Sequence, residues 1–456
     1  MPVRSRQAAQ RKRQRPATTV PSDERPRTVL TVGVTDHDAH WLGRIGRPER
    51  FRYLPVGDFA QADNPELCRP RAFVNDAVGA AKRLDERVHG VVAFDDYPAS
   101  LLAVAIAQKL GLPGPSLASV VACNNKAWSR LLQAAAAPEA VPRFQIIDPH
   151  RALRPGDLQL AFPFWLKPVK SSMSYLGFRI ASFPEFERAV AVSRAGLPAY
   201  SAAFQELMDM ARPSIPGDAA GVRADWLIAE ELLSGHQCTL DGVMSAGELT
   251  LIGVVDSIRL PNRVSFARFD YPSRLRRATQ AKMVDIAQRV LRRIGFDNGL
   301  FNIEFFVDER GEAPQVIEIN PRFSPQFSDL FEKVDGTLTH QYVVEMATGE
   351  TPSVTRRRGR HRIAASCVLR VARDHVVVRA PTARDIARLQ SAVPDTHVYV
   401  TAKTGDRLSQ AAQDSYSFRY GLIHLGARDR RDLKKKLAKA KKLLRYQLKP
   451  VEKSRR

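Results

Sequence analysis

The stretch FNIEFFVDERGEAPQVIEINPR, residues 301–322, constrains the fold more than any other part of the chain. Two apolar runs flank a polar connection with Gly311 at its centre, which predicts a β-hairpin. Side chains alternate between the two faces of a strand, and facing residues lie at equal distances from the turn. With the turn centred on Gly311, Glu304 faces Glu318. Each arm of a half-buried hairpin therefore carries a carboxylate directly opposite the other.

The rest of the hairpin follows from the same alternation. Asn302 faces Asn320, and Phe306 and Val316 are expected on the face of the two glutamates. The other face is expected to pack inward and carries Phe301, Ile303, Phe305, Ile317 and Ile319.

Two facing carboxylates repel each other unless a positive charge lies between them. Carboxylate oxygens beside an amide are typical ligands of a hard divalent cation such as Mg²⁺ or Mn²⁺, which proteins often share with substrate phosphates. Glu304, Glu318 and Asn320 are therefore the candidate metal ligands. The alternative is a solvated face with two unrelated glutamates.

Length and composition are typical of a globular protein of two to four domains. The chain has 456 residues, of which 44% are apolar, and no uninterrupted apolar run of about eighteen residues that would span a membrane. The N-terminal stretch MPVRSRQAAQRKRQRPATTV is basic and has no apolar segment, so we expect no secretory signal. The cysteines are scattered singly, which fits a reducing, cytoplasmic location. They are Cys68, Cys123, Cys238 and Cys367.

The net charge of +22 lies mainly at the two ends of the chain. Residues 1–27 carry +6 and residues 428–456 carry +11, which leaves +5 for the centre. The first tail is expected to be disordered. The last segment predicts an amphipathic helix and a tail. The apolar stripe of that helix is Leu433, Leu437, Ala440, Leu444 and Leu448. We favour a solubilising role for both ends. Nucleic-acid binding by them is expected to be limited to non-specific contacts.

The pattern along the chain predicts a mixed α/β and α+β protein. TVLTVGV and HGVVAF read as buried strands of an open α/β domain over residues 28–115. Asp95 and Asp96 follow the second strand, where they could contact substrate or cap the next helix. Residues 116–350 alternate strands and helices, 351–362 read as a linker, and 363–427 as a β-rich subdomain.

Two further segments could carry chemistry. FPFWLKPV places Lys167 at the end of a strand, followed by a turn with Ser171, Ser172 and Ser174. Such a turn can hold phosphate through the ammonium group and backbone N–H groups; an exposed surface lysine is the alternative. WLIAEELL could bind an adenine edge through its main chain, or could be an ordinary strand.

Taken in order, these pieces resemble the ATP-grasp superfamily. They are NNK at 124–126, FWLKPV with its serine turn, IAEELLSG, FNIEFF and VIEINPR. The resemblance covers about residues 115–350. It implies an ATP-grasp fold with an N-terminal open α/β domain and a β-rich C-terminal subdomain. It also implies a ligase that uses ATP to activate a carboxylate as an acyl phosphate, which an amine then attacks.

The resemblance implies a role for each matching residue. Lys126 and Lys167 would contact the ATP phosphates, and the turn that starts at Ser171 would cover them. Arg322, with Lys167, would stabilise the transferred phosphoryl group, while Mg²⁺ would bind the three metal ligands named above. The nucleoside would contact Glu230, Glu231, Leu232, Leu233 and Gln237.

The chain departs from the family pattern at three places. The phosphate-covering turn keeps only Gly177, Gln237 stands where a ribose-binding acid is common, and no glycine pair follows Arg322. Two other functions stay open: a biotin-carboxylase-like carboxylation, and a nucleotide-binding protein without catalysis. The expected partners are a small-molecule carboxylate and an amine, with no membrane, and the chain could form a homodimer.

Overall fold

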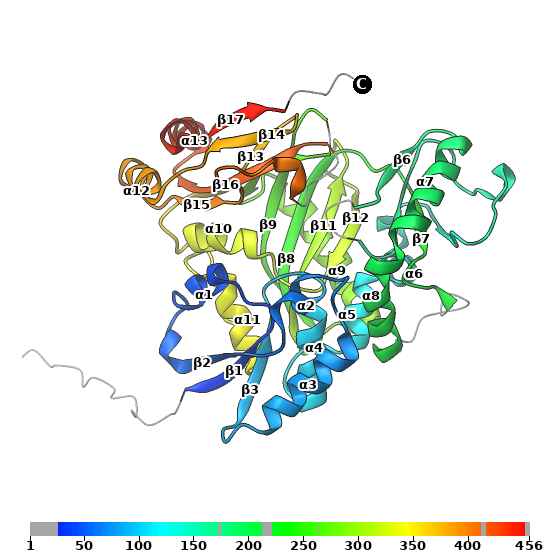
Figure 1. The fold of residues 1–456 in the computed structure, drawn as a ribbon, viewed down its shortest axis with the longest axis horizontal. Helices are drawn as coiled ribbons and strands as arrows, with labels where there is room; N and C mark the ends of the chain where they lie inside the picture. Colours follow the sequence, from blue (N-terminus) through cyan, green and yellow to red (C-terminus); the bar gives the residue numbers. More distant parts are fainter. Residues whose placement is uncertain (1–25, 172–174, 212–220, 263, 412–415, 452–456) are drawn as a thin grey trace, which may run out of the picture.

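The computed structural model describes residues 26–171, 175–211, 221–262, 264–411 and 416–451 (Figure 1). The predicted Ser172 and Ser174, and most of the basic N-terminal tail, lie outside the described residues.

The first part of the chain is a three-stranded parallel sheet covered by helices. Its strand order is β2-β1-β3, and α4 and α11 pack against β3. Strand β1 is buried along most of its length, as expected for the central strand of a parallel sheet, whereas β2 at the edge is only partly buried. The elements are β1 (Arg27–Thr31), α1 (Asp36–Leu42), β2 (Phe51–Pro55), α2 (Phe59–Asp63), α3 (Pro70–Lys82), β3 (Val88–Val92) and α4 (Ala99–Leu110).

A four-stranded antiparallel sheet follows, at the right of Figure 1, with strand order β4-β7-β5-β6. Helix α7 packs against β5 and β6 of this sheet. The elements are α5 (Leu117–Asn124), α6 (Lys126–Ala136), β4 (Phe144–Ile147), β5 (Phe164–Pro168), β6 (Phe178–Ile180), α7 (Phe183–Gly196), α8 (Pro198–Ala211) and β7 (Leu227–Glu231).

An eight-stranded antiparallel sheet forms the centre, with strand order β12-β11-β8-β9-β10-β13-β16-β15. Its strands are β8 (His236–Ser245), β9 (Glu248–Arg259), β10 (Phe266–Tyr271), β11 (Gly299–Val307), β12 (Pro314–Asn320), β13 (Ile363–Val371), β15 (His397–Val400) and β16 (Phe418–Ala427). The helices that follow or connect them are α9 (Arg277–Ile294), α10 (Pro325–Asp335), α11 (Thr339–Ala347), α12 (Ala383–Ala392) and α13 (Arg430–Leu444).

The segment 363–427 does not fold apart from the sheet that carries the hairpin. Strand β13 pairs with β10, where Tyr271 lies opposite Ala364, so β13, β16 and β15 extend the central sheet. A separate two-stranded sheet is formed by β14 (His375–Arg379) and β17 (Gln447–Pro450). The domain boundaries expected from the sequence stay predictions.

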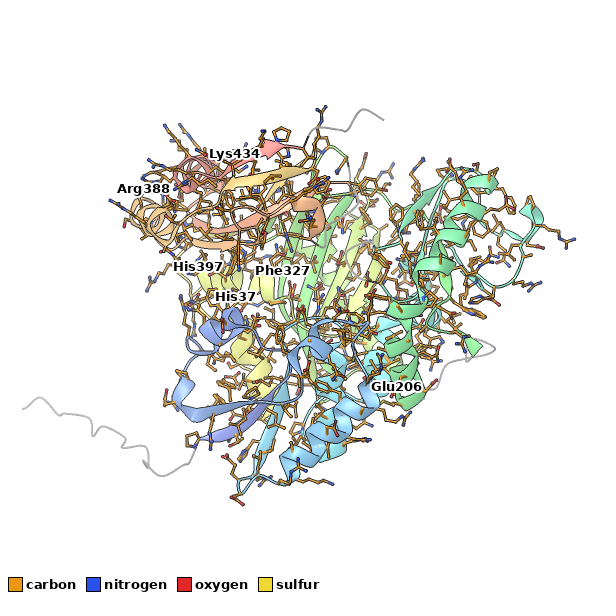
Figure 2. All side chains as sticks on the ribbon, viewed as in Figure 1. His37, Glu206, Phe327, Arg388, His397 and Lys434 are labelled. Carbon is orange, nitrogen blue, oxygen red and sulfur yellow. The ribbon has the colours of Figure 1, made fainter. Side chains whose placement is uncertain are left out.

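The C-terminal helix is shorter than the apolar stripe predicts. Helix α13 ends at Leu444, and Arg445 adopts a left-handed conformation with a φ of 55°. The chain then turns into β17, so Leu448 lies in a strand and its predicted place on the helix is wrong. Leu433 and Leu444 pack against the central sheet, while Lys434 points outward (Figure 2).

Within the described parts of the chain, no helix combines the length and the apolar character that crossing a bilayer requires.

Candidate functional site

The hairpin forms with the predicted pairing of its acidic residues. Glu304 faces Glu318 and Asn302 faces Asn320 across β11 and β12. The register then shifts by one residue, because a bulge lies between Glu304 and Phe305.

This bulge exchanges the faces expected for two apolar residues. Phe305 pairs with Val316, and Val316 packs in the core at 1% exposure. Ile317 instead lines the cleft described below. The prediction that Ile317 packs inward and Val316 shares the glutamate face is therefore wrong, because alternation alone assumes an unbroken ladder.

The two facing glutamates have different electrostatic surroundings. Lys126, the first residue of α6, places its Nζ 3.1 Å from Glu318 Oε1. Burial acts to raise the pKa of Glu318, but Lys126 and Lys167 bring it below its ordinary value. Burial and the neighbouring Glu318 raise the pKa of Glu304, which accepts a 3.0 Å hydrogen bond from Gln237. A cation bound at Glu304 would favour its charged form and so oppose the effects of burial and of Glu318.

The candidate metal ligands fit a hard divalent cation by their chemistry. Glu304 and Glu318 offer carboxylate oxygens. Asn320 donates its amide N–H to Asn302 Oδ1 at 3.3 Å, and Asn302 donates to Asp241 Oδ2 at 2.9 Å. The bond to Asn302 uses the nitrogen of the Asn320 amide, so the amide oxygen of Asn320 is available as a ligand. Among the described residues, no group of three or more His, Cys, Asp or Glu side chains is placed to hold a metal; this candidate set has two carboxylates and one amide.

Glu230 is a buried counter-ion for two cations. Its carboxylate lies 2.7 Å from Lys167 Nζ and 2.7 Å from Arg130 Nε. Burial acts to raise the pKa of Glu230, but Arg130 and Lys167 bring it down to about 2. Strand β7 pairs with β5 so that Glu230 lies opposite Trp165. The ion pair shows that the side chain of Glu230 holds Lys167 in place. The sequence predicted only a contact between Glu230 and the nucleoside.

Arg130 is a site residue that the sequence reasoning missed. It is 2% exposed, and it also donates to the backbone oxygen of Ile317 at 2.6 Å, which ties α6 to the hairpin. Arg130 follows Lys126 by four residues, so both lie on one face of α6. That spacing was a signal in the sequence that could have found it.

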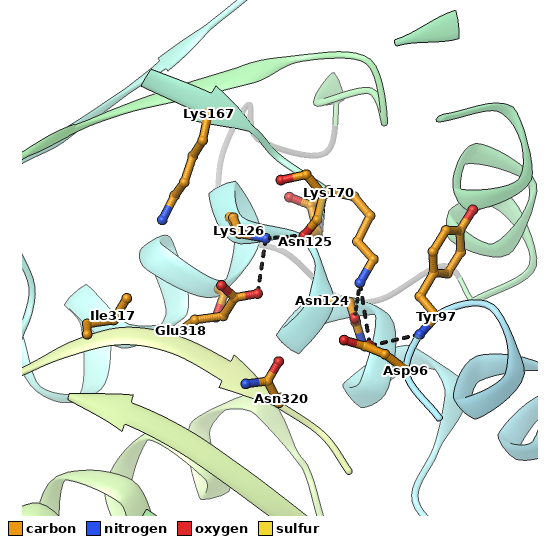
Figure 3. Close-up of polar contacts among 12 residues, drawn as sticks. Asp96, Tyr97, Asn124, Asn125, Lys126, Lys167, Lys170, Ile317, Glu318 and Asn320 are labelled. Atoms are coloured by element: carbon orange, nitrogen blue, oxygen red, sulfur yellow. Dashed lines mark hydrogen bonds and ion pairs between the residues drawn. The ribbon is translucent and has the colours of Figure 1, made fainter. Parts of the chain in front are cut away.

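Asp96 joins the first part of the chain to the hairpin. Arg322 donates to Asp96 Oδ2 at 3.1 Å. Lys170 Nζ lies 3.9 Å from Asp96 Oδ1 (Figure 3). Burial acts to raise the pKa of Asp96, but Arg322 and Lys170 bring it below its ordinary value. The N-cap of α4 is Pro98, with no side-chain bond, so the alternative that Asp95 or Asp96 caps this helix is wrong.

One cleft of about 2190 Å³ brings the predicted residues together. It is lined by Lys126, Lys167, Ser171, Glu230, Glu231, Leu232, Leu233, Gln237, Glu304, Glu318, Asn320 and Arg322. Asp95, Asp96 and Gly177 line it as well. The charges thus come from α6, β5, β7, β11 and β12, and from the segments that follow β3 and β12.

An aromatic ring that the sequence reasoning did not assign to binding also lines the cleft. The guanidinium carbon of Arg259 lies 4.7 Å from the ring centre of Phe306. Phe306 is next to the bulge and stands near the segment that follows β7, since Gln237 lies opposite it across β8 and β11. An aromatic face beside main-chain hydrogen-bonding groups suits a flat heterocycle.

Comparison with known proteins agrees with this fold. Residues 160–328 match the family model of the ATP-grasp domain. The chain thus contains an ATP-grasp domain, and the resemblance inferred from its motifs is confirmed.

The relatives and similar structures extend beyond that domain. An uncharacterised protein of Sinorhizobium fredii, y4rH, is 27% identical over 319 residues, which is 68% of this chain and 60% of that protein's length. An L-amino acid ligase from Bacillus licheniformis is similar in structure, with a TM-score of 0.66, 16% identity, and coverage of 95% of this chain and 100% of that chain.

A third similar structure is the biotin carboxylase domain of a 2-oxoglutarate carboxylase from Hydrogenobacter thermophilus, solved with MgADP, ADP and bicarbonate. Its TM-score is 0.61 at 14% identity, over 94% of this chain and 92% of that chain. These likenesses confirm the predicted ATP-grasp fold across nearly the whole chain.

Proposed function

We propose that this protein is a magnesium- and ATP-dependent ligase that activates a carboxylate as an acyl phosphate and joins it to an amine. The substrates we infer are amino acids or peptide-like molecules. The observation that carries the proposal is the facing pair Glu304 and Glu318, with Asn320 beside them, in the cleft that Lys126 and Arg322 also line.

The chemistry this site suits is phosphoryl transfer. Such reactions need little covalent work from the protein, and they depend on positive groups placed around the transferring phosphoryl oxygens. Magnesium bound at Glu304, Glu318 and Asn320 would neutralise phosphate charge and polarise the phosphoryl group. Lys126 and Lys167 bind phosphate oxygens in this proposal, and Arg322 stabilises the charge that develops on the acyl phosphate.

The surroundings of Lys167 support its role. Burial lowers the pKa of Lys167, while Glu230 acts to raise it. Glu230 also holds the ammonium at one place, 2.7 Å from its own oxygen. A lysine that is already oriented loses less conformational entropy when it binds phosphate.

The nucleoside is proposed to lie along the segment from Glu231 to Leu233, beside Phe306. Gln237 would hydrogen-bond a ribose hydroxyl or hold Glu304 in place, since its amide N–H already donates to that carboxylate at 3.0 Å. The proposed order along the cleft is therefore base, phosphates, metal ligands and then Arg322.

A phosphate-release screen tests the proposal. The full chain is incubated with MgATP and the common amino acids, singly and in pairs, and products are identified by mass spectrometry. We expect phosphate release that depends on an amino-acid pair, with a dipeptide-like product. Turnover that needs free biotin and bicarbonate instead would support the carboxylase alternative. MgATP binding with no turnover on any substrate would support a nucleotide-binding protein without catalysis.

A further inference from the structure

Lys170 occupies a position that is built around its charge. It directly precedes Ser171 and is 3% exposed. Its ammonium donates to Asn124 Oδ1 at 2.7 Å and lies 5.0 Å from the ring centre of Tyr97 (Figure 3). A buried ammonium is costly unless oxygen atoms or aromatic faces compensate for the lost water. Both kinds of group are present here.

Lys170 is not one of the described residues that line the cleft. Any influence of Lys170 on the reaction must therefore pass through a residue that does line it. That group is Asp96, whose Oδ1 lies 3.9 Å from the lysine ammonium. The other oxygen of Asp96 accepts the hydrogen bond from Arg322 at 3.1 Å. The carboxylate of Asp96 thus contacts two cations, Lys170 behind the cleft and Arg322 at its wall.

Charge balance gives this sharing a consequence. Asp96 with Arg322 alone would be a neutral pair, whereas Asp96 with Arg322 and Lys170 carries one net positive charge. Stabilising an anionic transition state requires a fixed positive group that is not already neutralised. Lys170 therefore leaves the charge of Arg322 available, while Asp96 still fixes the direction of the guanidinium.

The geometry points to Lys170 and Asp96 as positioning residues for the proposed reaction. Asp96 orients Arg322, and Lys170 balances the charge of Asp96 so that Arg322 acts as a full cation on the phosphoryl group. This inference rests on the proposed function, since Arg322 has its role only in that reaction.

Four variants of the full chain test it: Lys170→Met, Lys170→Arg, Asp96→Asn, and the double variant Lys170→Met with Asp96→Asn. The assay is phosphate release with MgATP and the amino-acid pair that gives the highest wild-type rate. Calorimetry measures the dissociation constant of MgATP in parallel. Methionine at position 170 can pack against Tyr97, so we expect the fold to persist, and a melting curve of each variant checks this.

We expect Lys170→Met to lower kcat about tenfold, less than the roughly hundredfold loss of a direct stabilising donor. The dissociation constant of MgATP changes less than about threefold, because Lys170 does not reach the cleft. Lys170→Arg keeps most of the rate. The double variant is faster than Lys170→Met, because removing the carboxylate charge frees Arg322 again, a non-additive result expected only for coupled residues.

A matched control is Lys109→Met, since Lys109 Nζ also donates to an asparagine, Asn75 Oδ1, at 2.7 Å but lies on the surface of α4. It is expected to keep the wild-type kcat. Two results overturn the inference alone: an active wild type with an equally active Lys170→Met, or a double variant whose loss equals the product of the two single losses. A wild type that releases no phosphate with any pair overturns the proposed function, and this inference with it.

Discussion

Lys126 forms an ion pair with Glu318, at 3.1 Å, while Glu304 on the facing strand has Gln237 as its hydrogen-bond donor. The hairpin therefore keeps one of its two carboxylates neutralised by a lysine from α6. The other stays in a buried environment that disfavours its charge.

Glu318→Gln is expected to reduce ADP formation by about 10²-fold or more, because it removes a proposed metal ligand and the partner of Lys126. ADP release with saturating MgATP measures the effect. The control is Glu332→Gln, which breaks a partly exposed pair with Arg44 at 3.2 Å, away from the cleft. A Glu318→Gln rate equal to the wild-type rate would show that this carboxylate takes no part in the reaction.

Arg130→Met is expected to lower the free energy of unfolding by about 3 kcal/mol, because Glu230 then keeps only one of its two buried cations. Urea unfolding followed by circular dichroism measures the loss. Arg143→Met is the matched control, since Arg143 pairs with the neighbouring Glu231 at 3.3 Å on the surface. An exposed pair is worth less than about 1 kcal/mol, so the control is expected to stay close to the wild type. Equal losses in the two variants would contradict the counter-ion role of Glu230.

Stability is expected to depend on Glu230 in the acid range. The pKa of Glu230 falls from an ordinary 4.5 to about 2 in the folded chain. A depressed carboxyl pKa contributes stability above pH 4.5, and the contribution is lost as pH falls toward 2. Glu230→Gln should therefore differ most from the wild type at neutral pH, and the difference in unfolding free energy should shrink on acidification. A difference that is constant with pH would contradict this.

The reaction rate is expected to fall as pH rises past the pKa of Lys170. Burial lowers the pKa of Lys170 to about 8, against the opposing effect of Asp96; Lys126, Glu318 and Arg322 are the other charged groups that act on it. Deprotonated Lys170 no longer balances Asp96, so kcat decreases on the alkaline side. Lys170→Arg keeps its charge and is expected to lose this limb of the pH profile. If kcat decreased equally at alkaline pH in the wild type and in Lys170→Arg, the decrease would belong to a group other than Lys170.

Removing magnesium is expected to remove most of the stabilisation by nucleotide. At a hundred times its dissociation constant a ligand adds about 2.7 kcal/mol of stability. A melting curve with MgATP should shift upward accordingly, and ATP with excess EDTA should shift it little. Glu304→Gln should reduce the MgATP shift. An equal shift with and without the metal would contradict the assignment of Glu304 and Glu318 as ligands.

The local parts of the site were predictable from the sequence. Alternation in two short strands predicted that Glu304 lies opposite Glu318, and the structure has this pair. The pairs next to the glycine turn differ from the prediction by one residue, and the register reaches the predicted one only beyond the bulge. The bulge was not predictable, because alternation assumes an unbroken ladder, and Val316 packs in the core on the face that alternation gave to Ile317. The resemblance to ATP-grasp proteins pointed to Lys167 and to the segment from Glu230 to Leu233, which line the cleft, and their roles stay predictions. It did not reveal the ion pairs of Glu230 with Arg130 and Lys167.

The remaining parts depend on contacts between distant segments. Arg322 and Asp96 are 226 positions apart, and Arg130 and Glu230 are 100 apart. No periodicity in one segment reveals such a pair. The pairing of β13 with β10 in the central sheet was not predictable either, because a strand pattern does not indicate which other strand it pairs with.

The ion pair between Lys126 and Glu318 affects how a metal ion would bind at the proposed ligands. An ion that arrives alone must compete with an ammonium group for one oxygen of Glu318. An ion that arrives with a triphosphate offers that ammonium a new anionic neighbour in exchange. In the proposed function, free magnesium is therefore expected to bind weakly and the magnesium–nucleotide complex strongly, because only the complex brings Lys126 a new anionic partner.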